Sequence, residues 1–153
     1  MRERQALFLD FLGEAATSPR RSRKGVYGAI DFGEPTQLVR VILLDTRTFR
    51  DDYRVPHTFW ETWPWPLWNV VTRLAGAALG GFLPSYTGDM LGDKQWNWLQ
   101  SVLANSSAQF HIIVSPVQVL TTHPAFESWA HFPLARARLL ELLSDVPGLV
   151  LVS

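Results

Sequence analysis

The 153-residue sequence contains no cysteine and no excess of charge of either sign. Without cysteine there can be no disulfide, no thiolate zinc site and no cysteine nucleophile, so histidine and carboxylate chemistry remains. The 14 Lys and Arg residues are balanced by 14 Asp and Glu residues, whereas binding to a polyanion needs a surplus of basic residues on one face. We therefore expect no nucleic-acid partner.

The sequence also lacks an uninterrupted apolar run long enough to span a membrane. Asp10 interrupts the short apolar stretch near the N-terminus, so we predict no signal peptide. Residues 62–88 are free of charge except for Arg73. A central charge and prolines near both ends argue against a spanning helix. The compartment stays open.

A tryptophan-rich insertion at about residues 56–88 separates two more regular parts of the chain. Four of the seven tryptophans lie within it, at Trp60, Trp63, Trp65 and Trp68. Tryptophan favours the headgroup layer of a membrane, where its apolar ring and its N–H group can both be satisfied. The insertion either packs on its own domain or makes shallow contact with a membrane.

Motifs of the common catalytic sites are missing. There is no nucleophile elbow, P-loop, dinucleotide-binding loop or zinc-protease motif. The four histidines, which are His57, His111, His123 and His131, do not have the spacing of metal ligands. Because His111 lies in an apolar strand, we expect it to be a hydrogen-bonded core residue. The sequence predicts no metal site within this chain.

Apolar periodicity and turn residues predict an α/β fold with a mixed sheet. The first two strands should form a hairpin across residues 33–36, and the last two should be parallel because a helix connects them. Residues 18–24 are basic and polar and should form a loop, either a connector or an anion-binding patch. The core should include Trp96, Leu99, Leu103, Leu140 and Leu143. The predicted strands are Lys24–Phe32, Gln37–Asp45, Gln109–Val114 and Gly148–Val152, and the predicted helices are Gln5–Gly13, Lys94–Ala104 and Pro133–Leu143.

Polar residues follow two of the predicted strands. In layered α/β proteins, ligands bind where strands end at their carboxyl edge. We therefore predict Arg47, Asp45 and Gln118 as substrate-binding residues. Arg47 could hold a phosphate with two hydrogen bonds, or it could form an ion pair with Asp45, Asp51 or Asp52. Ser115 lies at the same edge but lacks a base, since His111 is about 13 Å away along the strand.

Six segments in a fixed order give the chain a family resemblance. They read SPRRSRKGVY, LLDTRTFRDD, MLGDKQWNWL, SPVQVL, ESWAHFPLARARLLELL and PGLVLVS. In this order and spacing the chain resembles the middle of the PhoD-like alkaline phosphatases, metallophosphoesterases of the calcineurin-like superfamily. The resemblance implies a partial layered β-sandwich of mixed sheets with flanking helices. It also implies metal-dependent hydrolysis of phosphomonoesters or phosphodiesters, with a divalent metal or a mixed Ca/Fe centre in the complete protein.

The metal-ligand motifs of that family have no counterpart here. A Gly-Asp loop and an Asp-Asp-His-Asp stretch would come before Met1, and a Gly-Asp-Val-His stretch would follow Ser153. The strand that carries a metal-binding histidine in the wider superfamily continues here as residues 112–116, IIVSP. We therefore expect residues 1–153 to be a partial PhoD-like domain that is inactive by itself. The alternative is a non-catalytic remnant that binds a partner, or a membrane through the tryptophan-rich insertion.

Overall fold

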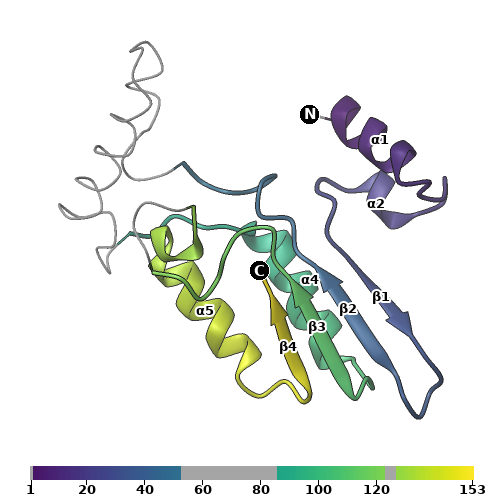
Figure 1. Ribbon diagram of the computed structural model, residues 1–153. Coiled ribbons are helices and arrows are strands. Elements are labelled where there is room, and N and C mark those ends of the chain that lie inside the picture. Colours follow the sequence, from purple (N-terminus) through teal and green to yellow (C-terminus); the bar gives the residue numbers. More distant parts are fainter. Residues whose placement is uncertain (1, 53–85, 123–126) are drawn as a thin grey trace.

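The computed structural model describes residues 2–52, 86–122 and 127–153 (Figure 1). Four strands form one sheet in the order β1-β2-β3-β4. In chain order the elements are α1 (Arg2–Phe11), α2 (Pro19–Ser22), β1 (Gly28–Phe32), β2 (Val39–Leu43), α4 (Gly92–Ala104), β3 (Phe110–Val114), η3 (Trp129–His131), α5 (Pro133–Leu143) and β4 (Leu149–Val152).

The sheet is mixed, as the sequence predicted. β1 and β2 form an antiparallel hairpin, whereas β2, β3 and β4 are parallel to one another. Gly33 turns the hairpin with φ of 95°, and a Cβ at this position would lie 2.5 Å from the carbonyl oxygen of Gln37. Only glycine therefore fits this turn. The parallel strands need long connections, and α4 and α5 lie within them.

Helices α4 and α5 cover one face of the sheet. Ile42 of β2 and Ile113 of β3 are fully buried there, together with Trp96 and Leu99 of α4. Trp96 makes an edge-to-face contact with Trp129, with ring centroids 6.4 Å apart. The core prediction is confirmed for Trp96, Leu99 and Leu143, whereas Leu103 and Leu140 are only partly buried. Leu139 is fully buried, because α5 is rotated so that this residue and Leu143, one turn apart, face the sheet.

Helix α1 is not docked through its apolar stripe. Leu7, Phe8, Phe11 and Leu12 are 45–86% exposed, whereas Leu9 is completely buried. Hydrogen bonds hold the opposite face of the helix. The side-chain amide of Gln5, one turn before Leu9, donates to the carbonyl oxygens of Arg20, Arg23 and Gly25 at 2.8–3.2 Å. The Gln5 face of the helix is therefore the docked face. The helix also begins earlier than predicted, at Arg2.

The predicted loop at residues 18–24 contains one helical turn, which corrects the prediction. The Ser18 hydroxyl accepts a hydrogen bond from the Arg20 N–H at 3.2 Å, and Pro19 occupies the first helical position. Both are ordinary signals for a helix start. His57, His123 and the tryptophans at 60, 63, 65 and 68 lie outside the described residues. Among the helices that are described, none has the length and apolar character needed to cross a membrane.

Candidate functional site

The carboxyl ends of β2, β3 and β4 lie at one edge of the sheet, together with the start of α4 (Figure 1). The Leu44 N–H donates to the carbonyl oxygen of Val114, and the Ser115 N–H donates to that of Val152, at 2.9 and 2.8 Å. The loops after these strands therefore begin side by side. This strand-exit edge is where the sequence placed Asp45, Arg47, Ser115 and Gln118.

Asp45 organises the loop that follows β2. Its buried carboxylate accepts hydrogen bonds from the Thr48 hydroxyl at 2.6 Å and from the N–H groups of Val26, Arg47 and Thr48 at 2.8–3.0 Å. Burial by itself would raise the pKa of Asp45, but these hydrogen bonds outweigh it and lower the pKa. The carboxylate is ionised and surrounded by donors from its own chain. It thereby ties the loop to residue 26, just before β1.

Gln95 holds the same loop from the side of α4. Its Oε1 accepts from the Asp45 N–H, and its Nε2 donates to the Asp45 carbonyl oxygen, both at 2.8 Å. Gln95 is completely buried. This residue was not singled out from the sequence. The available signal was a glutamine one helical turn from both Leu91 and Leu99, on the buried face of α4, where an amide needs partners.

Arg47 extends from this loop into solvent. Its backbone N–H is held by Asp45, but within the described part of the chain its guanidinium makes no hydrogen bond or ion pair. The sequence left open an ion pair with Asp45, Asp51 or Asp52. Asp51 instead accepts a hydrogen bond from the Asp89 N–H at 2.8 Å. Backbone contacts anchor the loop, and the guanidinium of Arg47 remains accessible to a ligand.

The two other polar residues of the edge differ in exposure. The side chain of Gln118 is exposed, while its carbonyl oxygen accepts from the Trp129 N–H at 2.9 Å. Ser115 is buried, donates to the Val117 carbonyl oxygen at 2.6 Å and accepts from the Trp129 indole N–H at 3.1 Å. Ser115 therefore stabilises the packing of Trp129, and its hydroxyl is not accessible to solvent.

His111 is the core histidine that the sequence predicted. It is 2% exposed, with Nδ1 2.9 Å from the Pro147 carbonyl oxygen and Nε2 2.7 Å from the Ser106 hydroxyl. A carbonyl can only accept, so Nδ1 carries the proton and Nε2 accepts from Ser106. Both ring nitrogens are therefore used inside the domain, and His111 is not a free base for Ser115.

Comparison with known proteins decides the family. A model of the PhoD-like phosphatases matches residues 8–152, which is nearly the whole chain. The chain belongs to the PhoD-like phosphatase family. A solved structure titled "Structure of PhoD" matches with a TM-score of 0.59 and 18% identity, covering 97% of this chain and 27% of that one. No curated protein matches. The structural likeness supports the mixed α/β fold, and the chain spans about a quarter of the PhoD chain.

PhoD-like phosphatases are metal-dependent hydrolases of phosphoric esters. A divalent metal needs several carboxylate oxygens or other ligands that are free to coordinate it. Asp45 is saturated by N–H and O–H donors. The carboxylate of Asp89 accepts from the N–H groups of Met90 and Gly92 and from the Trp96 indole, at 2.8–2.9 Å. Across residues 2–52, 86–122 and 127–153, no three potential ligands cluster. The described residues do not fit a metal site.

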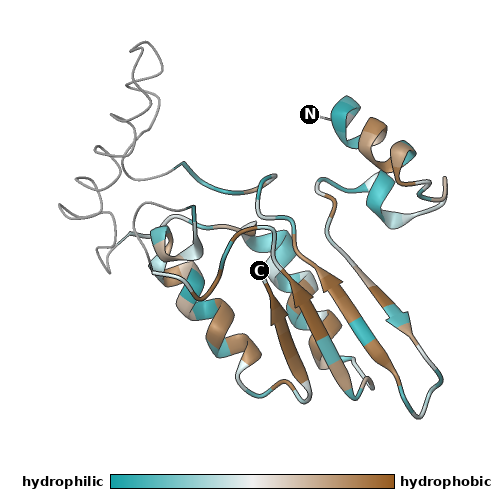
Figure 2. Cartoon of the chain, viewed as in Figure 1, coloured by the Kyte–Doolittle hydropathy of each residue, from teal (hydrophilic) through white to brown (hydrophobic). Residues whose placement is uncertain are grey.

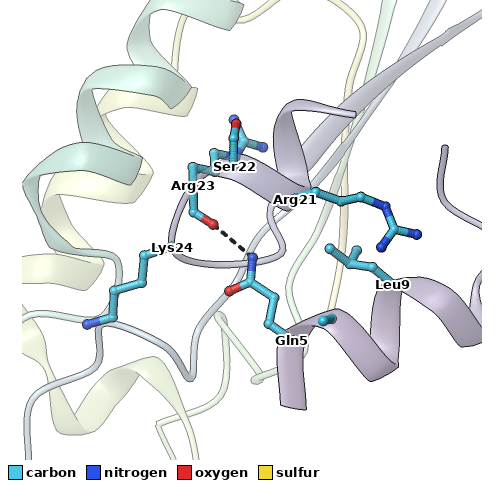
Figure 3. Close-up of a pocket in the computed structure, with 7 residues that line it drawn as sticks. Gln5, Leu9, Arg21, Ser22, Arg23 and Lys24 are labelled. Carbon is cyan, nitrogen blue, oxygen red and sulfur yellow. Dashed lines mark hydrogen bonds between the residues drawn. The ribbon is translucent and has the colours of Figure 1, made fainter. Parts of the chain in front are cut away.

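The basic segment of this PhoD-like chain lines a pocket beside α1 (Figure 3). The Arg21 guanidinium pairs with Asp10 at 2.7 Å, and the Arg23 guanidinium lies 3.9 Å from the centroid of the Tyr27 ring. Figure 3 shows the side chains of Arg21 and Lys24 pointing in different directions. Because these cations do not converge, the segment is better explained as a connector than as an anion-binding patch.

Proposed function

We propose that this chain forms the part of a PhoD-like phosphatase that frames the phosphoester site, with Arg47 as a phosphate-binding residue. The observation that carries the proposal is the exposed guanidinium of Arg47, which has no ion-pair partner among the described residues and lies at the strand-exit edge. Family membership supplies the substrate class, a phosphoric ester. A planar guanidinium matches two phosphate oxygens with two parallel hydrogen bonds.

Asp45, predicted as a substrate ligand, acts in this proposal as a positioning residue. Its carboxylate and the amide of Gln95 fix the backbone from which Arg47 projects. A loop that is already ordered loses less conformational entropy when a ligand binds. Gln118 is exposed on the neighbouring loop and is the third proposed contact, through its side-chain amide.

The isolated 153-residue chain should not hydrolyse phosphoesters. Ser115 and His111, the nucleophile and base that might be considered, are both buried and hydrogen-bonded to other groups. In a complete PhoD-like phosphatase, a divalent metal or a mixed Ca/Fe centre would supply the activated hydroxide. We propose that the ligands of this centre lie outside these 153 residues. The non-catalytic alternative depends on the tryptophan-rich insertion, of which residues 56–85 lie outside the described residues.

The first experiment measures turnover of a chromogenic phosphomonoester by the purified chain, with a series of divalent metals. We expect no rate above background. Turnover that is abolished by Asp45→Asn or Arg47→Ala would show instead that a complete centre exists at the end of β2.

The second experiment uses a longer protein, in which flanking PhoD-like sequence is joined to this chain. Arg47→Ala should lower kcat/KM by about 10- to 100-fold, because charge-assisted hydrogen bonds are worth about 1.5 to 3 kcal/mol. Arg47→Lys should recover part of this loss. Arg4→Ala, on α1, removes the same charge elsewhere and should leave kcat/KM unchanged. An active longer protein that tolerates Arg47→Ala would assign Arg47 no part in substrate binding.

A further inference from the structure

One ion pair joins two separate segments at the strand-exit edge. Arg50, in the loop after β2, donates through Nη1 to a carboxylate oxygen of Glu127, in the segment that leads into η3. The other ion pairs among the described residues join partners 6 to 11 positions apart, whereas Arg50 and Glu127 are 77 positions apart. Figure 2 shows the strands brown over most of their length and the chain after β2 largely teal. This long-range polar contact therefore lies beyond the sheet, on the loop that carries Arg47.

The backbone on both sides of Arg50 is fixed. Before it, the carboxylate of Asp45 accepts hydrogen bonds from two backbone N–H groups of the loop, both at 3.0 Å. After it, the Asp51 N–H donates to the carbonyl oxygen of Asp89 at 2.9 Å, and the Asp51 carboxylate accepts from the Asp89 N–H at 2.8 Å. The side chain of Arg50 therefore extends from the same ordered loop as that of Arg47.

Glu127 lies on a segment that is attached to Gln118. Ser128, the next residue, pairs with Gln118 in a parallel bridge, and the Trp129 N–H donates to the Gln118 carbonyl oxygen at 2.9 Å. Ser128 and Trp129 are both completely buried. The ion pair therefore connects the loop after β2 to a segment that is anchored in the core and holds the backbone of Gln118.

We propose that the ion pair of Arg50 with Glu127 is a positioning contact, which holds Arg47 and Gln118 at the spacing that one phosphoester requires. The inference rests on the proposed role of Arg47 in substrate binding. Stability alone is a weak reason for the pair, because its side chains are 21% and 35% exposed and ion pairs at the surface contribute little to folding. Position has a larger effect, since a displacement of about 1 Å in a substrate-positioning group can lower a rate by about 100-fold.

The first test measures the two segments without any substrate. Because the chain has no cysteine, Arg47→Cys and Gln118→Cys together place one spin label on each segment. Electron paramagnetic resonance then gives the distribution of distances between the labels. Glu127→Ala should broaden this distribution, whereas Asp10→Ala, which breaks the exposed ion pair with Arg21, should leave it unchanged. An unchanged distribution in Glu127→Ala would overturn the inference, since the ion pair would then not fix the segments.

The second test measures turnover of a chromogenic phosphomonoester by the longer PhoD-like protein. Arg50→Ala and Glu127→Ala should each lower kcat/KM by about 10-fold, mainly through KM, because the contact aligns binding groups and not the reacting atoms. The double variant should be no worse than either single variant, because both residues act through one contact. Arg50→Ala should have a smaller effect when Arg47→Ala is already present. Asp10→Ala should leave kcat and KM unchanged.

The outcomes separate this inference from the proposed function. If Arg47→Ala lowers kcat/KM while Arg50→Ala and Glu127→Ala do not, the inference is overturned and the proposed function stands. If Arg50→Ala lowers it and Glu127→Ala does not, Arg50 contacts the substrate itself, and the inference is again overturned. If Arg47→Ala has no effect, the proposed function is overturned and the inference with it. Far-UV circular dichroism checks the fold of each variant, and Arg50→Gln replaces Arg50→Ala if the latter does not fold.

Discussion

Gln95 forms hydrogen bonds with both backbone groups of Asp45, so that a side chain of α4 continues the pairing of β2 beyond its last residue. A neighbouring strand would normally supply this donor and this acceptor. The carboxylate of Asp45 then organises the following residues. The position of Arg47 thus depends on a contact between residues 50 apart in the sequence.

Gln95→Ala should lower the free energy of unfolding by about 2 to 4 kcal/mol, because it leaves two buried backbone groups without partners. Urea denaturation of the purified chain gives this value. Gln100→Ala, on the exposed side of the same helix, should change it by less than about 0.5 kcal/mol. Equal stability of the two variants would mean that water replaces the amide of Gln95 at no cost.

Asp45 should make the stability depend on pH in the acid range. Its pKa is lower in the folded chain than in the unfolded chain. The stabilisation is therefore fully present above the unfolded pKa of about 3.9 and is lost as the pH falls through the lower folded value. Asp45→Asn should be less stable than the parent at pH 7 and should lose less stability between pH 5 and pH 2.

Two other carboxylates serve as references for the Asp45→Asn experiment. Asp31 also has a lowered pKa, mainly through its hydrogen bonds with Arg40, so some acid sensitivity should persist in Asp45→Asn. Glu34→Gln, in the exposed hairpin loop, should keep the full pH dependence of the parent. An identical pH profile for the parent and Asp45→Asn would contradict the proposed role of the Asp45 carboxylate.

Leu99→Ala should cost about 2 to 5 kcal/mol of unfolding free energy, because Leu99 is completely buried between α4 and the sheet. Leu120→Ala is the matched control, since Leu120 is 63% exposed, and should change stability by less than about 0.5 kcal/mol. Thermal or urea unfolding measures both. A small effect at Leu99 would mean that α4 does not pack as described.

His111→Phe should destabilise the chain by about 1 to 3 kcal/mol, since it removes the partners of the Pro147 carbonyl oxygen and the Ser106 hydroxyl. Ser106→Ala removes only the second of these hydrogen bonds and should cost less. If both variants were as stable as the parent in urea, the two hydrogen bonds would contribute nothing to the fold.

The sequence was informative wherever a local pattern decides the structure. The predicted strand Gln37–Asp45 contains β2, and the predicted helix Pro133–Leu143 has the bounds of α5. The same holds for His111, whose place in an apolar strand already implied a buried imidazole. In each case a few neighbouring residues carry the information.

The sequence was less informative where contacts between residues far apart in the chain determine the structure. The apolar stripe of α1 was visible, but the docking of Gln5 on the segment from Arg20 to Gly25 was not. Likewise, the place of Asp45 at the end of a predicted strand suggested a ligand-binding carboxylate, but it gave no sign that one donor to this carboxylate is Val26, which is 19 residues away. Polar pairings at long range leave no periodic signal in a single sequence.

The parallel pairing of β2 with β3 also has a kinetic consequence. The hairpin of β1 and β2, and the unit of β3, α5 and β4, can each form from neighbouring residues, but β2 and β3 meet only after residues 44–109 have closed into a loop. Joining these two parts should therefore limit the folding rate. The closure entropy rises only by about 0.6 kcal/mol for each doubling of loop length. With this topology the stretch between β2 and β3 can thus be lengthened or shortened with little loss of stability, and the change would appear mainly in how fast the chain folds.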